Sequence, residues 1–255
     1  MDTGTALIGV PTVGSLGVMI RATALGVAAT AVAGWAGPAL LRARVLRAAV
    51  CPELAGIGRP GSVALTFDDG PDPEGTPAVL DALDRLGWTA TFFMLGAQVN
   101  RYPEVAAAVV AAGHEAAVHG FSHRNHLARG PADVHRDVAR ATAMVRAATG
   151  ARPTWFRPPY GVLTLGSLSA ARRAGLRPVL WTAWGRDWEP RSPAQVADTV
   201  CGQLRPGGTV LLHDSDCVAR MAGSWQTTVQ ALPRLAELAD QLGCTVGPLR
   251  DHLCQ

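Results

Sequence analysis

Short apolar runs and segments of helical periodicity alternate along the chain from residue 61 onward. The run Val63–Phe67 has the length and composition of a buried strand, and the next segment, Thr76–Leu86, has helical spacing and is followed by Gly87. The pattern predicts further strands over Thr89–Leu95, His114–His119, Thr154–Arg157, Arg177–Thr182, Gly208–His213 and Cys244–Val246. It predicts further helices over Pro103–Ala112, Pro131–Thr149, Gly166–Ala174, Pro193–Leu204 and Trp225–Leu242. We therefore expect an α/β protein.

About seven strand-plus-helix units follow one another, which implies parallel strands with helices outside. A barrel and an open doubly wound sheet both satisfy this alternation. Three residues with chemically active side chains, Asp68, His119 and His213, come at or just after the ends of predicted strands. In a barrel these ends converge on one face, whereas an open sheet would spread the first and last across its width. The sequence therefore favours a barrel.

The first 60 residues differ from the rest, and we expect them to contain a hydrophobic helical segment. The turn-rich joint Gly56–Gly61 divides them from a domain over residues 61–255. The stretch Ala22–Leu41 has 20 residues without a charge, which is long enough to span a membrane, although Ala and Gly are frequent in it. A cleaved signal peptide and a soluble helix packed on the domain are the alternatives. We expect membrane association through this stretch.

Composition and charge limit the classes of partner. The chain is 48% hydrophobic and 17% charged, so it has enough apolar residues for a sizeable core. The net charge is only +3, and no basic cluster with interleaved aromatic residues is present, so we expect no nucleic-acid partner. Three arginines follow Ala22–Leu41 and one precedes it, which by the positive-inside rule favours a cytoplasmic domain. The sequence leaves the oligomeric state open.

Two histidines and two adjacent acids suggest a metal site. His119 and His123 are four residues apart, and on a helical turn that spacing places both imidazoles on one face. Ordinary surface hydrogen bonding is the alternative. Asp68 and Asp69 follow a predicted strand, and we expect their carboxylates to point in different directions, so that one can ligate while the other does something else. Two histidines and one carboxylate form a common catalytic zinc set, with a position left for water.

Five short segments occur in one order: TFDDGP (Thr66–Pro71), HGFSH (His119–His123), RPPYG (Arg157–Gly161), RDW (Arg186–Trp188) and LLHD (Leu211–Asp214). In this order they resemble the polysaccharide deacetylase family (carbohydrate esterase family 4, the NodB homology domain). The resemblance covers roughly residues 61–250. It implies a distorted (β/α)7 barrel and metal-dependent removal of acetyl groups from N-acetylated sugars.

The resemblance also implies a role for each matching residue. By it, Asp68 is the general base, and His213 is the general acid that protonates the leaving amine. The metal ligands it implies are Asp69, His119 and His123, for Zn²⁺ or alternatively Co²⁺ or Ni²⁺. The supporting residues it implies are Arg157, which holds Asp68 and keeps it ionised; Asp187, which orients His213; Tyr160, whose backbone N–H helps to polarise the carbonyl; and Trp188 and Leu211, which line the acetyl pocket.

The chain departs from the family pattern at two positions. Trp184 stands where the family usually has a second acid, three residues before Asp187, and Gly120 replaces a Thr or Ser after the first histidine. Neither change touches an expected ligand, base or acid. They bear instead on substrate preference and on the tuning of His213.

We expect a metal-dependent hydrolase that deacetylates amino sugars of a cell-wall polysaccharide, either peptidoglycan or a chitin-like glycan. The expected location is at a membrane with the domain on the extracellular, cell-wall side. A deacetylase of a lipid-linked sugar precursor, facing the cytoplasm, is the first alternative. A sugar-binding domain that holds a metal but does not hydrolyse is the second.

Overall fold

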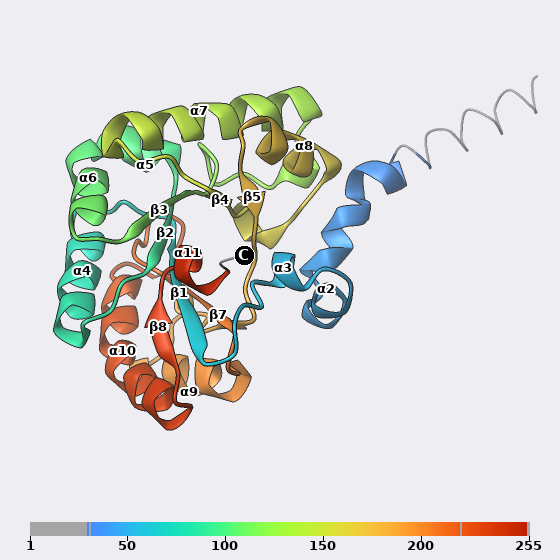
Figure 1. Cartoon of the computed structure of the whole chain (residues 1–255). Helices are drawn as coiled ribbons and strands as arrows, with labels where there is room; N and C mark the ends of the chain where they lie inside the picture. The colour runs from blue at the N-terminus through green and yellow to red at the C-terminus, as the bar shows by residue number, and fades with distance from the viewer. Residues whose placement is uncertain (1–29, 31, 220, 254–255) are drawn as a thin grey trace, which may run out of the picture.

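The computed structural model describes residues 30, 32–219 and 221–253, and within them all strands pair in parallel in one curled sheet (Figure 1). The strands are β1 (Ser62–Asp68), β2 (Thr91–Met94), β3 (Glu115–Val118), β4 (Trp155–Phe156), β5 (Arg177–Pro178), β6 (Ala183–Trp184), β7 (Thr209–His213) and β8 (Thr245–Gly247). Their order is β5-β4-β3-β2-β1-β7-β6, and β8 pairs with the start of β1. This arrangement confirms the distorted barrel expected from the sequence.

Helices surround the sheet (Figure 1). They are α4 (Gly75–Leu86), α5 (Gly96–Arg101), α6 (Pro103–Ala111), α7 (Pro131–Thr149), α8 (Leu165–Arg173), α9 (Pro193–Gln203), α10 (Ser224–Gln241) and α11 (Leu249–His252), with the 3-10 turns η2 (His126–Ala128) and η3 (Pro159–Gly161). The predicted helices are all present, and α7 has the predicted bounds because Pro131 opens it and Gly150 closes it in the left-handed conformation. The sequence pattern missed β6, α5 and α11, which are short.

Side chains of the central strands point alternately to the two faces of the sheet, and each face contributes to a separate buried apolar cluster. Phe67 of β1 stacks on Phe92 of β2 with ring centroids 5.1 Å apart, and both belong to the main buried cluster that also includes helix side chains. Ala64 and Phe93 point to the other face and form a smaller buried cluster. Because side chains two residues apart share a face, Asp68 at the end of β1 lies on the same inner face as Ala64. The strand thus delivers a carboxylate to the C-terminal mouth of the barrel.

The sheet is open between β5 and β6, which among the described residues pair only with β4 and β7. The chain from Gly37 to Ala55 covers this opening as the 3-10 helix η1 (Gly37–Arg42) followed by α2 (Arg44–Val50) and α3 (Pro52–Ala55). The backbone N–H of Leu180 donates to the carbonyl of Leu54 at 2.8 Å, and the hydroxyl of Thr209 donates to the carbonyl of Gly56 at 2.6 Å. Figure 1 shows α2 and α3 beside the strands on that side.

The N-terminal segment also packs on α8. Gly166 leaves room for Trp35, because a Cβ at that glycine would lie 2.4 Å from the Trp35 ring. Most of the stretch Ala22–Leu41 that we expect to associate with a membrane lies outside the described residues. Among the residues that the structure describes, no helix combines the length and the apolar character that a membrane span requires. In the described part, Trp35 packs against Gly166 and Arg47 is buried, as the soluble-helix alternative expects, whereas Leu40, Val45 and Val50 are exposed. The proposed boundary at residue 61 stays a prediction.

Candidate metal centre and active site

The two adjacent acids at the end of β1 face the same cluster of histidines. His119 Nε2 lies 3.7 Å from Asp68 Oδ2 and 3.4 Å from Asp69 Oδ1. The expectation that the two carboxylates diverge is therefore wrong. The reason is the backbone of Asp69, whose φ of 80° is in the left-handed region and interrupts the alternation of the strand. The two acids differ in their partners rather than in their direction.

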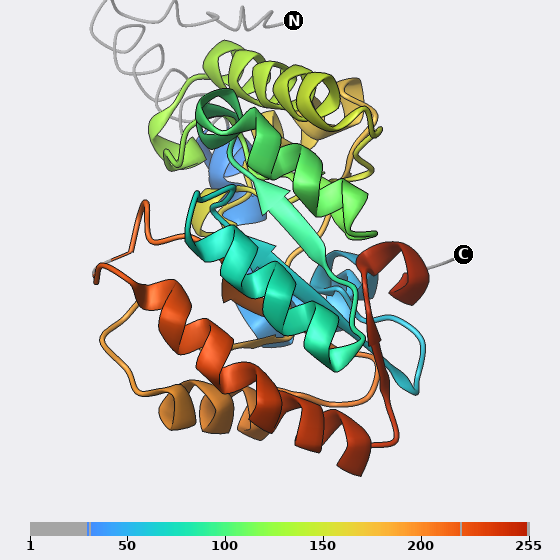
Figure 2. The ribbon, with the colours of Figure 1, turned by 90° about the vertical axis from the view of Figure 1, so that its left-hand side faces the viewer.

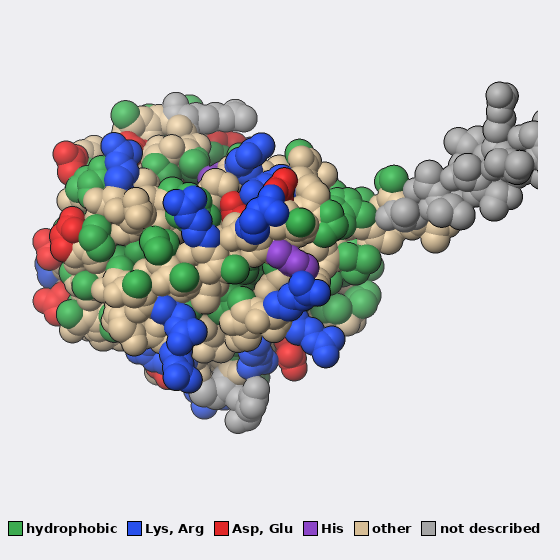
Figure 3. All heavy atoms as spheres, turned by 90° about the horizontal axis from the view of Figure 1, so that it is seen from above, with side chains coloured by type: hydrophobic (Ala, Val, Ile, Leu, Met, Phe, Trp, Pro, Cys, Tyr) green, Lys and Arg blue, Asp and Glu red, His purple; other side chains and the backbone are tan. Residues whose placement is uncertain are grey.

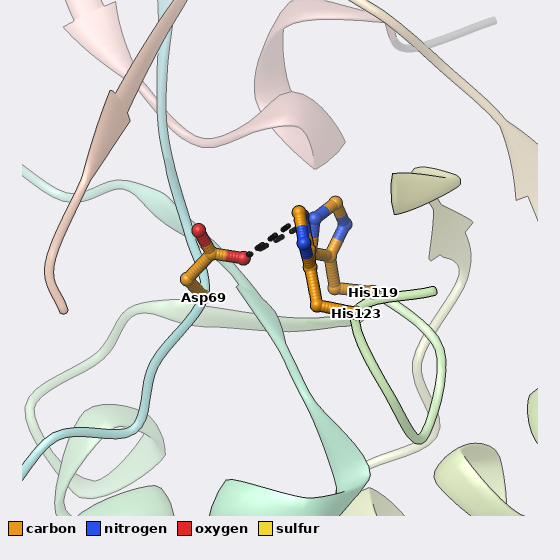
Figure 4. Close-up of side chains that lie close together, drawn as sticks. All are labelled: Asp69, His119 and His123. Carbon is orange, nitrogen blue, oxygen red and sulfur yellow. Dashed lines mark ion pairs between the residues drawn. The ribbon is translucent and has the colours of Figure 1, made fainter. Parts of the chain in front are cut away.

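His119 and His123 come together through a loop and not through a helix, so the helical argument for their spacing is wrong. His119 follows β3 directly, and Gly120 turns the chain with a φ of 88°. Asp137 on α7 holds this loop, because its carboxylate accepts the backbone N–H of Phe121 at 2.7 Å and the hydroxyl of another loop residue. The two imidazole centroids lie 5.4 Å apart, on one side of Asp69 (Figure 4).

Asp69, His119 and His123 offer ligand atoms that all lie within 4.8 Å of one another. The Oδ1 atom of Asp69 is buried without a hydrogen-bond partner, and it faces Nε2 of His119 at 3.4 Å and of His123 at 3.6 Å. Two imidazoles and a carboxylate form a donor set that suits zinc and neighbouring divalent metals. The residues present therefore fit a catalytic divalent metal.

The protonation of these groups also fits a metal. Burial, with smaller effects of nearby charges, lowers the pKa of His119 and of His123 to about 3, so both imidazoles are neutral at pH 7. His119 Nδ1 lies 2.8 Å from the carbonyl oxygen of Arg157, which fixes the proton there and leaves Nε2 free to ligate. Burial raises the pKa of Asp69 to about 7, against the charge of His213. A divalent cation would favour the ionised form of this acid.

Arg157 follows β4 and holds Asp68 from within the barrel. Its side chain is fully buried, and Nη1 donates to Asp68 Oδ1 at 2.6 Å and to the hydroxyl of Thr66 at 2.9 Å. Its other amino group donates to the carbonyl of Leu180, and its guanidinium lies 4.0 Å from the ring centroid of Phe93. Burial raises the pKa of Asp68 and the charge of Arg157 opposes this. The arginine thus favours the ionised carboxylate, as expected, while burial opposes it.

His213, the last residue of β7, is held by an acid from the loop after β6. Its Nδ1 lies 2.9 Å from Asp187 Oδ1, and its backbone N–H donates to Asp187 Oδ2 at 2.7 Å. Thr228 on α10 donates its hydroxyl to the same Oδ2 at 2.7 Å. Burial alone would lower the pKa of His213, but the charge and hydrogen bond of Asp187, with smaller effects of the two metal-site acids, raise it to about 9. The imidazole is therefore protonated at neutral pH.

The predicted site residues surround one pocket of about 380 Å³, except Arg157 and Asp187, which lie behind Asp68 and His213. The loops after β3 and β7 lie on one side of the sheet, opposite the C-terminus (Figure 2). Tyr160 lies at the pocket with a φ of 60°, and its ring centroid is 4.3 Å from that of His123. Trp188 meets His213 edge-on with ring centroids 5.1 Å apart, and Leu211 is buried in the floor of the pocket.

Sequence reasoning missed or left open several residues around this pocket. Trp181 and Trp184 both line the pocket, and neither has a sequence signal that distinguishes a pocket residue from a core residue. Asp214 is buried, and its carboxylate accepts hydrogen bonds from the backbone N–H of Gly70 and from the hydroxyl of Thr76. Its position directly after the LLHD histidine was the only available signal. Arg42 also lines the pocket, and nothing in the sequence of an N-terminal segment points to that.

Comparison with known proteins agrees with this geometry. The family model described as "Polysaccharide deacetylase" matches residues 55–179. The chain is similar to a chitooligosaccharide deacetylase of Bradyrhizobium sp. (strain ANU 289), with 39% identity over 194 residues, 74% of this chain and 89% of the relative. It is also similar to a peptidoglycan-N-acetylglucosamine deacetylase of Bacillus cereus, with 33% identity over 174 residues, 68% of this chain and 61% of the relative.

Among solved structures, the fold is similar to that of a family 4 carbohydrate esterase from Streptomyces lividans in complex with acetate. The TM-score is 0.66 and the sequence identity 31%, over 73% of this chain and 92% of that chain.

Proposed function

This chain belongs to the polysaccharide deacetylase family, carbohydrate esterase family 4, and on that premise we propose that it removes acetyl groups from N-acetylated amino sugars of a cell-wall polysaccharide. The single observation that carries the proposal is that three groups of side chains face one pocket. A metal-ligand set, an acid held by arginine and a histidine held by an acid all face it. The names of the relatives, a chitooligosaccharide and a peptidoglycan deacetylase, support the substrate class.

In this reaction Asp68 accepts a proton from the attacking water while the water oxygen bonds to the acetamide carbonyl carbon. A divalent metal held by Asp69, His119 and His123 would acidify water and polarise the carbonyl. Arg157 fixes the carboxylate of Asp68 by its 2.6 Å hydrogen bond, so that the free oxygen faces the pocket. The base is thus oriented before substrate binds.

Breaking the carbon–nitrogen bond requires a proton for the departing amine. His213 lies in the pocket wall, and the neighbouring Asp187 raises the pKa of its imidazole, so it is suited to supply that proton, with acetate and a free amino sugar as the products. Asp187 holds the imidazole in position from the side away from the substrate. The backbone N–H of Tyr160 would stabilise the negative charge on the carbonyl oxygen.

The test is acetate release by the full chain from N-acetylated chitooligosaccharides and peptidoglycan fragments. We expect release that chelation abolishes and that Zn²⁺ restores, with Co²⁺ and Ni²⁺ as comparisons because the same donor set accepts them. A folded, metal-loaded protein that binds these glycans but releases no acetate would contradict the proposal and would favour the non-hydrolytic sugar-binding alternative.

The proposed location is at a membrane through Ala22–Leu41, with the domain on the cell-wall side. Exposed apolar side chains on the described part of the N-terminal segment, Val32, Leu40, Val45 and Val50, support membrane association. Figure 3 shows hydrophobic side chains gathered where the described chain begins. A C-terminal fusion tests the orientation. Alkaline phosphatase activity supports the cell-wall side, whereas fluorescence of a cytoplasmic reporter favours the lipid-linked precursor at the inner face.

A further inference from the structure

The catalytic pocket continues into a second hollow beneath the N-terminal segment. Arg42, Trp181 and Trp184 line both spaces, so the two adjoin. The second hollow has a volume of about 690 Å³ and lies between η1 with the start of α2 on one side and the chain around β6 on the other. A substrate longer than one sugar unit would therefore extend along the N-terminal segment.

Three tryptophans form a row from the catalytic histidine toward this second hollow. Trp188 meets His213 edge-on, the ring centroids of Trp188 and Trp184 are 5.1 Å apart, and those of Trp184 and Trp181 are 5.7 Å apart. Trp184 is the residue that stands in place of the family's second acid. Aromatic faces offer apolar contact to the C–H faces of sugar rings, so the row is suited to hold the unit next to the one being deacetylated.

Arg42 supplies a positive charge beside this row, because it lines both spaces together with Trp181 and Trp184. Its side chain is exposed, and none of the residues that the structure describes forms an ion pair with it. The other arginine of the catalytic pocket, Arg186, is already paired with Glu189 at 2.6 Å. Arg42 therefore retains its capacity to bind an anion, and its guanidinium is suited to a carboxylate or a phosphate.

The segment that carries Arg42 is fixed in place by a buried arginine. Arg47 donates to the carbonyl of Trp181 at 2.5 Å, and its other amino group donates to the carbonyls of Leu41 at 2.9 Å and Arg42 at 3.2 Å. The same side chain thus joins the backbone that precedes Arg42 to the backbone of the tryptophan row. The position of the cation relative to the catalytic pocket is set by the fold and not by a loose terminus.

We propose that Arg42 is a specificity-determining residue that pairs with an anionic group, carboxylate or phosphate, on the unit next to the deacetylated sugar. The proposal rests on the deacetylase function proposed above and deepens it. A carboxylate would come from an acidic neighbouring sugar of a polymer, and a phosphate from a phosphorylated or lipid-linked precursor. Both would lie on the row of tryptophans with the acetamide toward Asp68.

The test compares three N-acetylated substrates on the full chain. They are neutral diacetylchitobiose, the same disaccharide with a phosphate at its reducing end, and a disaccharide of N-acetylglucosamine and N-acetylmuramic acid, which carries a carboxylate. We expect at least one anionic substrate to have a lower KM than the neutral one. Arg42→Gln should raise that KM about tenfold without changing kcat, and should leave the neutral substrate unaffected.

Two further variants separate this role from general effects of charge. Arg42→Lys should retain most of the preference because it keeps the positive charge. Arg85→Gln removes one exposed arginine from α4, outside the pocket, and should change nothing. A preference for the phosphate or for the carboxylate identifies the source of the anion. Equal KM values for neutral and anionic substrates, or an equal effect of Arg42→Gln on all three, would overturn the proposal.

Binding measured by calorimetry makes the result independent of turnover. If no substrate yields acetate, the proposed deacetylase function fails, but the role of Arg42 is still decided by affinity. Weaker binding of an anionic disaccharide to Arg42→Gln than to the wild-type chain, with unchanged binding of the neutral one, supports the proposal. Unchanged binding of all three contradicts it.

Discussion

Asp68 and Asp69 are adjacent in sequence, but each has different partners and therefore different chemistry. Asp68 is bound by the buried guanidinium of Arg157, whereas Asp69 turns an oxygen without a hydrogen-bond partner toward two imidazoles. Both acids are buried, and both have a raised pKa chiefly because of that burial. The difference between them lies in their partners, a guanidinium for Asp68 and two neutral imidazoles for Asp69, and it supports the roles of base and ligand that we propose.

The base assignment predicts the effect of Asp68→Asn. The amide keeps an acceptor for Arg157 but cannot take a proton from water, so we expect kcat to fall by about 10²–10⁴-fold. Metal content should stay near that of the wild type, because Asp69 and the histidines are untouched. Acetate release and metal analysis measure both effects, with the exposed acid of Asp81→Asn as a control. Wild-type turnover of the Asp68 variant would exclude this residue as the base.

For a variant of Asp187 we expect a different result from that of Asp68→Asn, because Asp187 acts on His213 from outside the pocket. Asp187→Asn removes the charge that raises the pKa of the imidazole, so we expect kcat to fall by about 10²-fold or more while KM stays unchanged. Thr228→Val removes only the hydroxyl that donates to the same acid, and a loss of less than tenfold is expected. Steady-state kinetics give both values. If Asp187→Asn raised KM and left kcat intact, a role in substrate binding would replace the one proposed.

At the scale of elements, the loop after β3 brings together two of the three candidate metal ligands. The turn at Gly120 brings His123 back beside His119, and Asp137 on α7 fixes the loop through two hydrogen bonds. A Cβ at Gly120 would lie 2.9 Å from the carboxylate of Asp137. The glycine that replaces the usual hydroxyl residue therefore allows the close approach of α7 to the loop.

Gly120→Ala is expected to lower metal affinity by about 10–100-fold, because the methyl group forces the loop and its histidines away from Asp69. Gly113→Ala is a matched control: Gly113 has a φ of 86° but no atom within 4 Å of the added methyl group. Both variants strain the backbone, but only the first disturbs the metal ligands. Competition with a chromogenic zinc chelator measures the difference. Equal affinities of the two variants would show that the contact with Asp137 is unimportant.

The sequence predicted the elements well wherever a long periodic segment is bounded by helix- or strand-ending residues. The helix over Pro131–Thr149 and the strand around Val63–Phe67 are long, periodic and bounded by Pro, Gly or an acidic turn. The two-residue strand Ala183–Trp184 has no periodicity that a pattern could show. The direction of Asp69 could not be predicted either, because the sign of φ at a non-glycine residue depends on the surrounding structure. The site residues were found through motifs, whereas their geometry depends on such local turns.

At the scale of the whole molecule, the N-terminal segment is part of the barrel wall. It covers the opening between β5 and β6, and it buries Arg47 against the carbonyl of Trp181. A division at residue 61 would separate these contacts from the rest. The contacts of the segment with the barrel therefore predict that it contributes to stability.

Removal of residues 1–55 is therefore expected to lower the melting temperature by about 5 °C or more, because the exposed edges and the Trp181 backbone lose their partners. Arg47→Met should produce a smaller decrease in the full chain, since it removes only the arginine hydrogen bonds. Differential scanning fluorimetry measures both. A truncated protein with the melting temperature of the full chain would show that the segment is dispensable for stability.

The cover over the β5–β6 opening also bears on how the protein is made. Unpaired strand edges readily join edges of other chains, and nascent proteins are most exposed to this while incomplete. Arg47 and Trp181 are 134 residues apart in sequence, and the ribosome synthesises the cover first. When the edge strands leave the ribosome, the segment that shields them has already been translated. Among the described residues the sheet does not close between β5 and β6, and we expect the order of translation to limit aggregation through these edges.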